Sequence, residues 1–210
     1  MTASLVAPSL TARRTPALLS ALVAAWLTLA IVLSAAGVFR GPVSSPPIAL
    51  GIFSAGPPLA ILALLLTSDR VRSWARQADL RVLTQLQMLR VAGFTLLVLG
   101  VMGSLPRSFA LPAGIGDVIV ALTAPLVATF VLGTSRRWIF VAWTAFGIFD
   151  LINAVTLGIL NTDSSIGLLT HGANSNAMGS LPLSLIPVFG VPFTMILHLL
   201  SLPHLRRWNA

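Results

Sequence analysis

Six apolar stretches divide the sequence, and each is long enough to cross the roughly 30 Å hydrocarbon core of a bilayer as an α-helix. A hydrophobic fraction of 56% and a charged fraction of 9% exclude an ordinary soluble domain, in which about 25% of the residues are charged. The sequence therefore predicts an all-α polytopic membrane protein, a bundle of six transmembrane helices that forms a single transmembrane domain over residues 1–210. The predicted spans cover residues 17–39, 48–67, 85–104, 111–132, 138–160 and 181–202.

Prolines recur in every second predicted span. Pro58, Pro125 and Pro192 stand 67 residues apart in the second, fourth and sixth spans. Because proline removes a backbone hydrogen bond and clashes with the preceding turn, we expect a kink in each of these helices. The spacing is consistent with three repeated helical hairpins, although so restricted an alphabet also produces such a spacing by coincidence.

The arginines are distributed unevenly between the two sides of the predicted bundle. Apart from Arg90, which falls inside a span, only Arg40 and Arg107 lie on one side, and the other ten lie on the opposite side. Positive residues are enriched in cytoplasmic loops, so this bias predicts that both termini are cytoplasmic. All 13 basic residues are arginine, which is typical of a GC-rich bacterial genome, and we expect a bacterial inner membrane. The pair Arg13 and Arg14 also resembles a twin-arginine export signal, but the apolar stretch after it is long for such a signal.

Composition excludes several chemistries and partners. The chain has no Cys and no Lys, which excludes disulfides, thiolate metal sites, a cysteine nucleophile and a lysine Schiff base. The net charge of +8 lies in short loops, where it orients the chain, and we expect no nucleic-acid partner. His171 and Met178 are too few for a metal site, and His171 and His198 fall near opposite sides of the membrane, which does not suit the two axial ligands of a haem. We expect no cofactor and no metal. The lipid bilayer is the expected partner, and a homodimer or a larger membrane complex remains open.

Polar residues inside the predicted spans point to a common interior. Ionisable side chains are costly in a bilayer and normally face the middle of a helical bundle. Asp150 shares one helical face with Gly147 and Ala154, and small residues of this kind mark helix contacts. The opposite stripe of this helix, predicted to face lipid, consists of Ile148, Ile152, Val155 and Ile159. The predicted polar interior or ion path consists of Arg90, Asp117, Asp150, Asn153 and His198.

Helical rise gives the interior charges approximate depths. At 1.5 Å per residue, Asp117 is expected about 9 Å below the outer boundary, Asp150 about 15 Å and Arg90 about 21 Å. These steps are within reach of the side chains, so we expect Arg90 to neutralise Asp150 if their helices adjoin. Asp117 would then lie nearer the outside and His198 nearer the cytoplasm.

A segment around Asp117 carries two resemblances. Residues Leu105 to Pro125, LPRSFALPAGIGDVIVALTAP, resemble a segment of uncharacterised small bacterial six-span inner-membrane proteins that carry LPAGxGD, which implies the same topology and no activity. Residues Gly114 to Asp117 read GIGD and are similar to the GxGD motif of intramembrane aspartyl proteases such as presenilins and prepilin peptidases. That similarity implies a catalytic dyad of Asp117 and Asp150, in which two carboxylates share a proton and activate water. In those proteases the second Asp precedes the motif, whereas Asp150 follows it, and the later PAL motif of presenilins is missing.

The sequence thus leaves three functions open. The first, which we favour, is a non-catalytic membrane subunit or accessory protein whose interior charges hold the helices in register. The second is a small proton- or ion-linked transporter or channel that uses Arg90, Asp117 and Asp150. The third is an intramembrane aspartyl protease that uses the dyad, and an enzyme is the less favoured interpretation.

Overall fold

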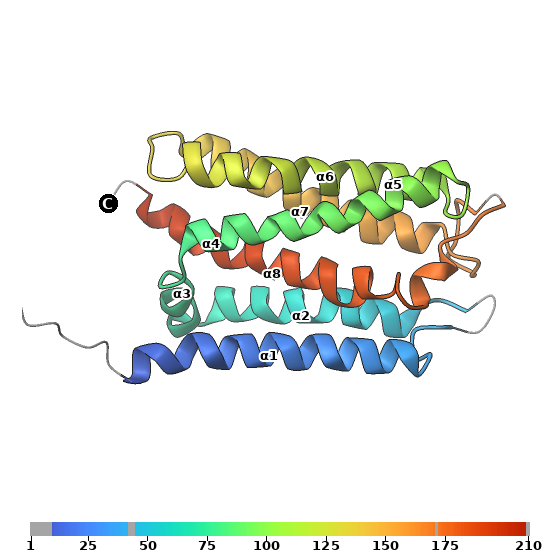
Figure 1. Ribbon diagram of the computed structural model, residues 1–210, viewed down its shortest axis with the longest axis horizontal. Helices are drawn as coiled ribbons and strands as arrows, with labels where there is room; N and C mark the ends of the chain where they lie inside the picture. Colours follow the sequence, from blue (N-terminus) through green and yellow to red (C-terminus); the bar gives the residue numbers. More distant parts are fainter. Residues whose placement is uncertain (1–9, 42–44, 171, 209–210) are drawn as a thin grey trace, which may run out of the picture.

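The computed structural model describes residues 10–41, 45–170 and 172–208. Within these ranges every regular element is a helix, so the predicted all-α class is confirmed. Six helical segments are long and apolar enough to cross a membrane, and they lie along the long axis of the molecule (Figure 1). The chain is therefore a multi-pass membrane protein. The α-helices are α1 (Leu10–Ala35), α2 (Ile48–Thr67), α3 (Asp69–Ala75), α4 (Leu80–Gln85), α5 (Phe94–Val101), α6 (Arg107–Phe130), α7 (Arg137–Leu160) and α8 (Val191–Ser201).

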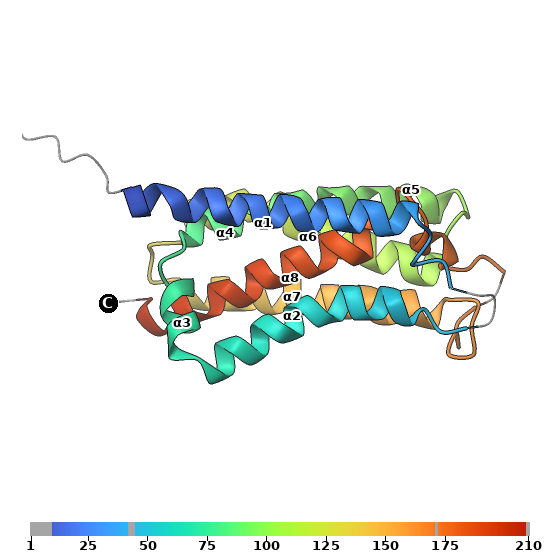
Figure 2. The same cartoon turned by 90° about the horizontal axis from the view of Figure 1, so that it is seen from below.

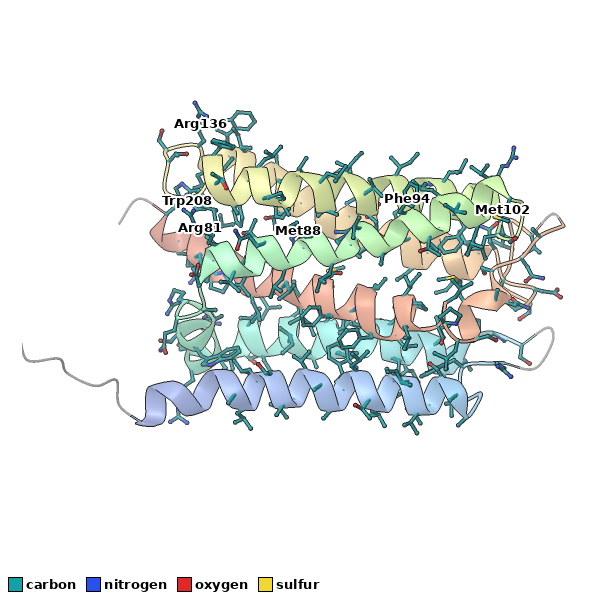
Figure 3. The ribbon with its side chains drawn as sticks, in the orientation of Figure 1. Arg81, Met88, Phe94, Met102, Arg136 and Trp208 are labelled. Atoms are coloured by element: carbon teal, nitrogen blue, oxygen red, sulfur yellow. The ribbon has the colours of Figure 1, made fainter. Side chains whose placement is uncertain are left out.

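The two ends of the bundle differ in charge and in the length of their connections. Arg81 and Arg136 lie at one end, together with α3 and Trp208, and we call this the arginine-rich end (Figure 3). At the other end lie Arg40, Arg107 and the connection of residues 161–185, and we call this the loop end (Figure 1). The spans alternate in direction between the two ends, as an up-and-down helical bundle requires.

The third span consists of three helical segments. It begins with α4, passes through a 3₁₀ segment (Leu86–Gly93) and ends with α5, and together these form one rod from Leu80 to Val101. It begins five residues before the predicted start because the side chain of Asp79 caps α4, accepting a bond from the backbone of Arg81 at 2.8 Å. Figure 3 shows Met88, Phe94 and Met102 along this rod, and all three are exposed on the outer surface of the bundle. Arg90 lies in the 3₁₀ segment and is buried in the interior.

Proline affects the three even-numbered spans differently. Pro57 and Pro58 lie inside α2, and Figure 2 shows that α2 changes direction near its middle. The sixth span starts with a π segment (Ile186–Gly190), after which Pro192 occupies the first turn of α8. α6 runs as one continuous helix through both of its prolines. The sixth span begins five residues later than predicted, at Ile186 rather than residue 181.

α6 is the central helix of the polar half of the bundle. It packs against the third span on one side and against α7 on the other, while α2 packs against α8. Small residues along its buried face allow this close approach of backbones, as in other membrane helices. α1 lies at the edge of the bundle (Figures 1 and 2), and most of its described side chains are exposed. The buried small residues of α6 are Ala110, Ala113, Gly114, Gly116, Ala121, Ala124 and Ala128.

α3 covers the arginine-rich end of α2. Nη1 of Arg72 donates to the backbone oxygens of Leu65 at 2.7 Å and Leu66 at 2.9 Å, which are among the carbonyls that a helix C-terminus leaves free. Nη2 of Arg72 donates to the exposed carboxylate of Asp69, and this bond lowers the pKa of Asp69 below its usual value. The turn between the second and third spans is thus held by side-chain bonds to the helix end.

Candidate functional site

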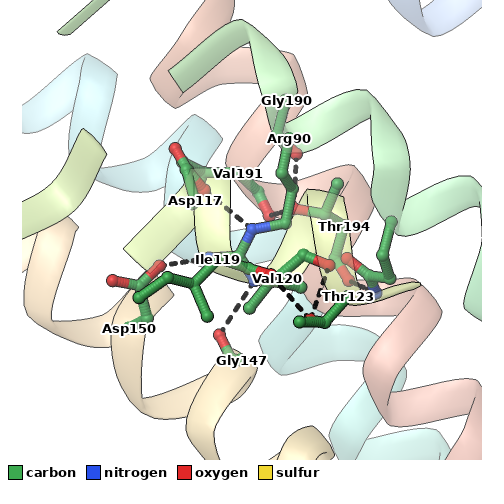
Figure 4. A network of polar contacts seen from close by, with 11 residues as sticks. Arg90, Asp117, Ile119, Val120, Thr123, Gly147, Asp150, Gly190, Val191 and Thr194 are labelled. Atoms are coloured by element: carbon green, nitrogen blue, oxygen red, sulfur yellow. Dashed lines mark hydrogen bonds and ion pairs between the residues drawn. The ribbon is translucent and has the colours of Figure 1, made fainter. Parts of the chain in front are cut away.

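Three charged side chains from three spans meet in the middle of the bundle (Figure 4). Nε of Arg90 donates to Oδ1 of Asp117 at 2.7 Å, and Nη2 of Arg90 donates to Oδ2 of Asp150. Nη1 of Arg90 donates to the backbone oxygen of Gly147 at 3.2 Å. Only 2% of the Arg90 side chain is exposed, so the third span, α6 and α7 are joined by one buried guanidinium. We call Arg90, Asp117 and Asp150 the charged triad.

The triad assembles because its members lie at one depth. Asp117 is ten residues from the loop end of α6, Asp150 is ten residues from the loop end of α7, and Arg90 is eleven residues from the loop end of the third span. At 1.5 Å per residue these positions are about 15 to 17 Å deep. The expected depths of Asp117 and Arg90 were wrong because α6 begins at Arg107 rather than residue 111, and the third span ends at Val101 rather than residue 104. The expected contact of Arg90 with Asp150 is present, and Asp117 joins it on the same guanidinium.

Glycines provide the space for the polar side chains. A Cβ atom at Gly93 would overlap the Asp117 side chain, and one at Gly116 would overlap the Asp150 carboxylate. A Cβ atom at Gly147 would overlap the His198 imidazole. The three spans therefore approach closely only because these positions have no side chain.

The GIGD segment has a structural explanation in this packing. A Cβ atom at Gly114 would overlap the side chain of Leu97 and lie 3.0 Å from the backbone oxygen of Gly93, so Gly114 allows α6 to contact the third span. Gly116 accommodates the Asp150 side chain on the neighbouring helix, and Asp117 binds Arg90. The residues of the GIGD segment thus make a contact with the third span, a contact with α7 and an ion pair with Arg90.

The two aspartates do not face each other as a shared-proton dyad would. The guanidinium of Arg90 lies between their carboxylates, and each carboxylate is bound to it (Figure 4). One positive group faces two negative groups, so the ionised triad carries one unbalanced negative charge. Such an arrangement suits charge pairing between helices better than the activation of a water molecule between two carboxylates.

His198 lies beside the triad on the side of the arginine-rich end. It is 1% exposed, packs edge-on against Trp143 with ring centroids 5.3 Å apart, and its Nε2 has no hydrogen-bond partner in the described structure. Among the other buried polar atoms of the described residues that have no partner are Oε1 of Gln87 and Oγ1 of Thr144. Nε2 of Gln87 donates to the backbone oxygen of Thr194 at 3.0 Å, which joins the third span to α8. Neither Gln87 nor Thr144 was predicted to belong to the polar interior, although Gln87 lies one helical turn from Arg90 and Thr144 lies one turn from Gly147, whose backbone oxygen binds the guanidinium.

The remaining predicted site residue, Asn153, lies away from the guanidinium. It is half-buried on α7, about one turn beyond Asp150 toward the loop end, and no bond joins it to the triad in the described structure. Of the five residues predicted to form the polar interior, three therefore make one bonded cluster and His198 borders it. The described residues contain no group of three or more His, Asp or Glu side chains that could hold a metal ion.

A cavity of about 210 Å³ extends from the triad to the loop end. Asp117 lines it at the triad, and Arg40, Ser45 and Asn176, all exposed, line it at the loop end. We call it the loop-end cavity. Most of its wall is apolar and is formed by α2, α5, α6, α7 and the start of the sixth span.

The cavity changes the interpretation of the exposed stripe on α7. Ile152 is 55% exposed on the outer surface of the bundle, as predicted. Val155 and Ile159 were predicted to face lipid, but both line the loop-end cavity and are half-buried. Branched apolar side chains suit both a lipid-facing surface and the wall of a cavity, so the sequence could not distinguish these two environments.

A comparison with known protein families identifies one family that matches most of the chain. The family described as Domain of unknown function (DUF8737) matches residues 47–206, which include α2 to α8 and the entire triad. The chain belongs to this family. The expected resemblance to uncharacterised membrane proteins is thus supported at the level of an uncharacterised domain with six candidate membrane spans. Comparisons with curated proteins and with solved structures gave no match.

The packing of Gly116 predicts a specific intolerance. Gly116→Ala should destabilise the protein by about 1 to 3 kcal/mol, because the new methyl group displaces the Asp150 carboxylate from its position beside Arg90. Gly51→Ala on α2 is the matched control, since a Cβ atom there meets no neighbouring atom within 4 Å, and it should be neutral or slightly stabilising. Reversible unfolding in mixed detergent micelles measures both variants. Equal stability of the two variants would contradict the close contact between Gly116 and Asp150.

Proposed function

We propose that this protein is a non-catalytic subunit or accessory protein of a bacterial inner membrane, in which the charged triad holds three spans in register. The observation that supports this is that Arg90 is bonded to both other members of the triad. Arg90 is bound to both carboxylates and to a backbone oxygen, and its side chain is almost entirely buried. A buried charge that is fully paired specifies which helices adjoin and at what depth, which is a structural role.

The proposed partners follow from the surface of the bundle. The bilayer is the first partner, because large apolar side chains are exposed along the first five spans. A second copy of the chain or another membrane protein is the proposed protein partner. α1 offers the surface for such a contact, because it lies at the edge of the bundle and outside the segment that matches the family (Figure 1).

A transporter or channel is the second candidate, and the polar atoms on both sides of the triad favour it. The loop-end cavity reaches Asp117 from one side. On the other side lie the unpartnered atoms of Gln87, Thr144 and His198, to which water molecules can bind. A proton or ion that passed the triad would have a polar path in both directions, with the ion pairs of Arg90 as the barrier.

The triad geometry predicts unequal effects of neutral replacements. Arg90→Met should cost about 3 to 5 kcal/mol because it leaves two buried carboxylates unpaired, whereas Asp150→Leu should cost less because Arg90 keeps Asp117. The double variant should regain part of the loss, and the triple variant with Asp117→Leu should regain most of it, since no unpaired charge is left. Unfolding in detergent micelles measures the three single variants, including Asp117→Leu, and the double and triple variants. Additive effects of the three single replacements would show that the side chains do not interact, which would contradict the structural role.

Proton flux separates the two candidate functions. In liposomes with a trapped pH indicator and an imposed pH gradient, the subunit proposal expects the wild-type protein to collapse the gradient no faster than protein-free liposomes. It expects the same of the triple variant. Wild-type flux that is clearly faster than that of the folded triple variant would overturn the subunit proposal and support transport through the triad.

The arginine bias predicts the orientation in the membrane. A green fluorescent protein fused to the C-terminus should fluoresce, and alkaline phosphatase fused there should be inactive, because the arginine-rich end is proposed to be cytoplasmic. Alkaline phosphatase fused after Leu168, which is 75% exposed in the loop-end connection, should be active. The reverse pattern of activities would refute the proposed orientation.

A further inference from the structure

The loop-end cavity has the features of a binding site for a cation. We propose that it binds a small protonated monoamine with an apolar body, and that Asp117 is the counter-ion of the ammonium group. This goes beyond the proposed subunit role, because it assigns a ligand to a cavity that the register of the helices does not require.

Charge at the base of the cavity selects a cation. Oδ1 of Asp117 accepts the bond from Arg90, while Oδ2 accepts no hydrogen bond from the described residues. The Asp117 side chain keeps 11% of its surface exposed, and it lines the cavity. When both carboxylates are ionised, the triad carries one negative charge more than Arg90 balances, and in an interior of low dielectric a positive charge beside it stabilises that ionised form. An ammonium group at Oδ2 supplies that charge.

A second polar side chain belongs to the wall of the cavity, and a rotation about its Cα–Cβ bond would bring its hydroxyl to the ligand. Ser54 on α2 lines the cavity, is 2% exposed, and its Oγ has no partner in the described structure. A buried hydroxyl without a partner is costly, and a ligand in the cavity can satisfy it. Asp117 and Ser54 come from α6 and α2, so the two polar groups approach the cavity from different spans.

The wall and the volume define the body of the ligand. Leu50, Leu96, Phe109, Ile186 and Val191 contribute apolar surface to the cavity. A cavity of about 150 Å³ holds benzene, so the volume of about 210 Å³ accommodates one ring with a short amine-bearing arm. Arg40 lies at the loop end, where it is exposed and its Nε donates to Oγ of Ser180 at 3.1 Å. Its charge is screened by water there, whereas the charge of Asp117 is not.

Binding to the full-length protein in nanodiscs of zwitterionic lipid tests the assignment. Three probes of similar size are compared by isothermal titration calorimetry, with empty nanodiscs subtracted: 2-phenylethylamine, the uncharged 2-phenylethanol and the anionic 3-phenylpropanoate. The amine should bind about tenfold or more tightly than the alcohol, because only the amine forms a charged hydrogen bond to Asp117. Equal affinities for amine and alcohol, or a preference for the carboxylate, would overturn the proposal.

Two variants identify the site of binding. Asp117→Asn should abolish the preference for the amine over the alcohol, and this ratio is informative even if the variant is less stable. Ala154→Leu places a larger side chain in the cavity wall and should weaken the binding of both amine and alcohol about tenfold or more. The matched control is Ala145→Leu on the exposed face of the same helix, which should bind both probes as the wild type does. Amine binding that is unaffected by Ala154→Leu would place the ligand elsewhere and refute the assignment. The proton-flux assay contains no amine, so it tests the subunit proposal separately. A failure of the amine proposal therefore does not change its result.

Discussion

The pairing of one guanidinium with two carboxylates in a medium without water determines how this bundle is assembled. A charged side chain that faced lipid would lose its hydration without gaining a partner, so Arg90, Asp117 and Asp150 must all lie in the interior. The planar guanidinium has donors on several sides, which allows Arg90 to bind carboxylates from two different helices at once. Because the three side chains are short compared with the helices, their contact also determines the depth at which the third span, α6 and α7 adjoin.

This charge pairing depends on the absence of side chains at neighbouring positions. Gly93, Gly116 and Gly147 each lie where a Cβ atom would overlap a polar side chain of another span. In a membrane, helices gain little from the hydrophobic effect when they associate, so close packing and interhelical polar contacts supply the stability. The glycines contribute to both, since they bring the backbones together and leave space for the ion pairs.

The imbalance of charge connects the structure to a function. A scaffold needs only one carboxylate for one guanidinium, and the second carboxylate, when it is ionised, makes the triad negative. Asp117 supplies one of the two carboxylates and also lines the loop-end cavity. The register of the spans and the proposed recognition of an amine thus use the same residue, Asp117. The unpartnered nitrogen of His198 on the opposite side has no role in either.

The sequence by itself determined the fold class, the six spans and the charged residues that occupy the interior, because hydrophobic length and the cost of a charge in lipid are properties of single segments. It also indicated that Arg90 and Asp150 would meet, since helical rise places them at accessible depths. Only the tertiary structure decided that Asp117 shares the guanidinium, that the glycines of the GIGD segment accommodate neighbouring side chains, and that Val155 and Ile159 line a cavity. These features depend on exact helix ends, which hydropathy locates only within several residues, and on which helices adjoin. Arg90 lies 27 residues from Asp117 and 60 residues from Asp150 along the chain, so their contact is a property of the packed bundle and of no single segment.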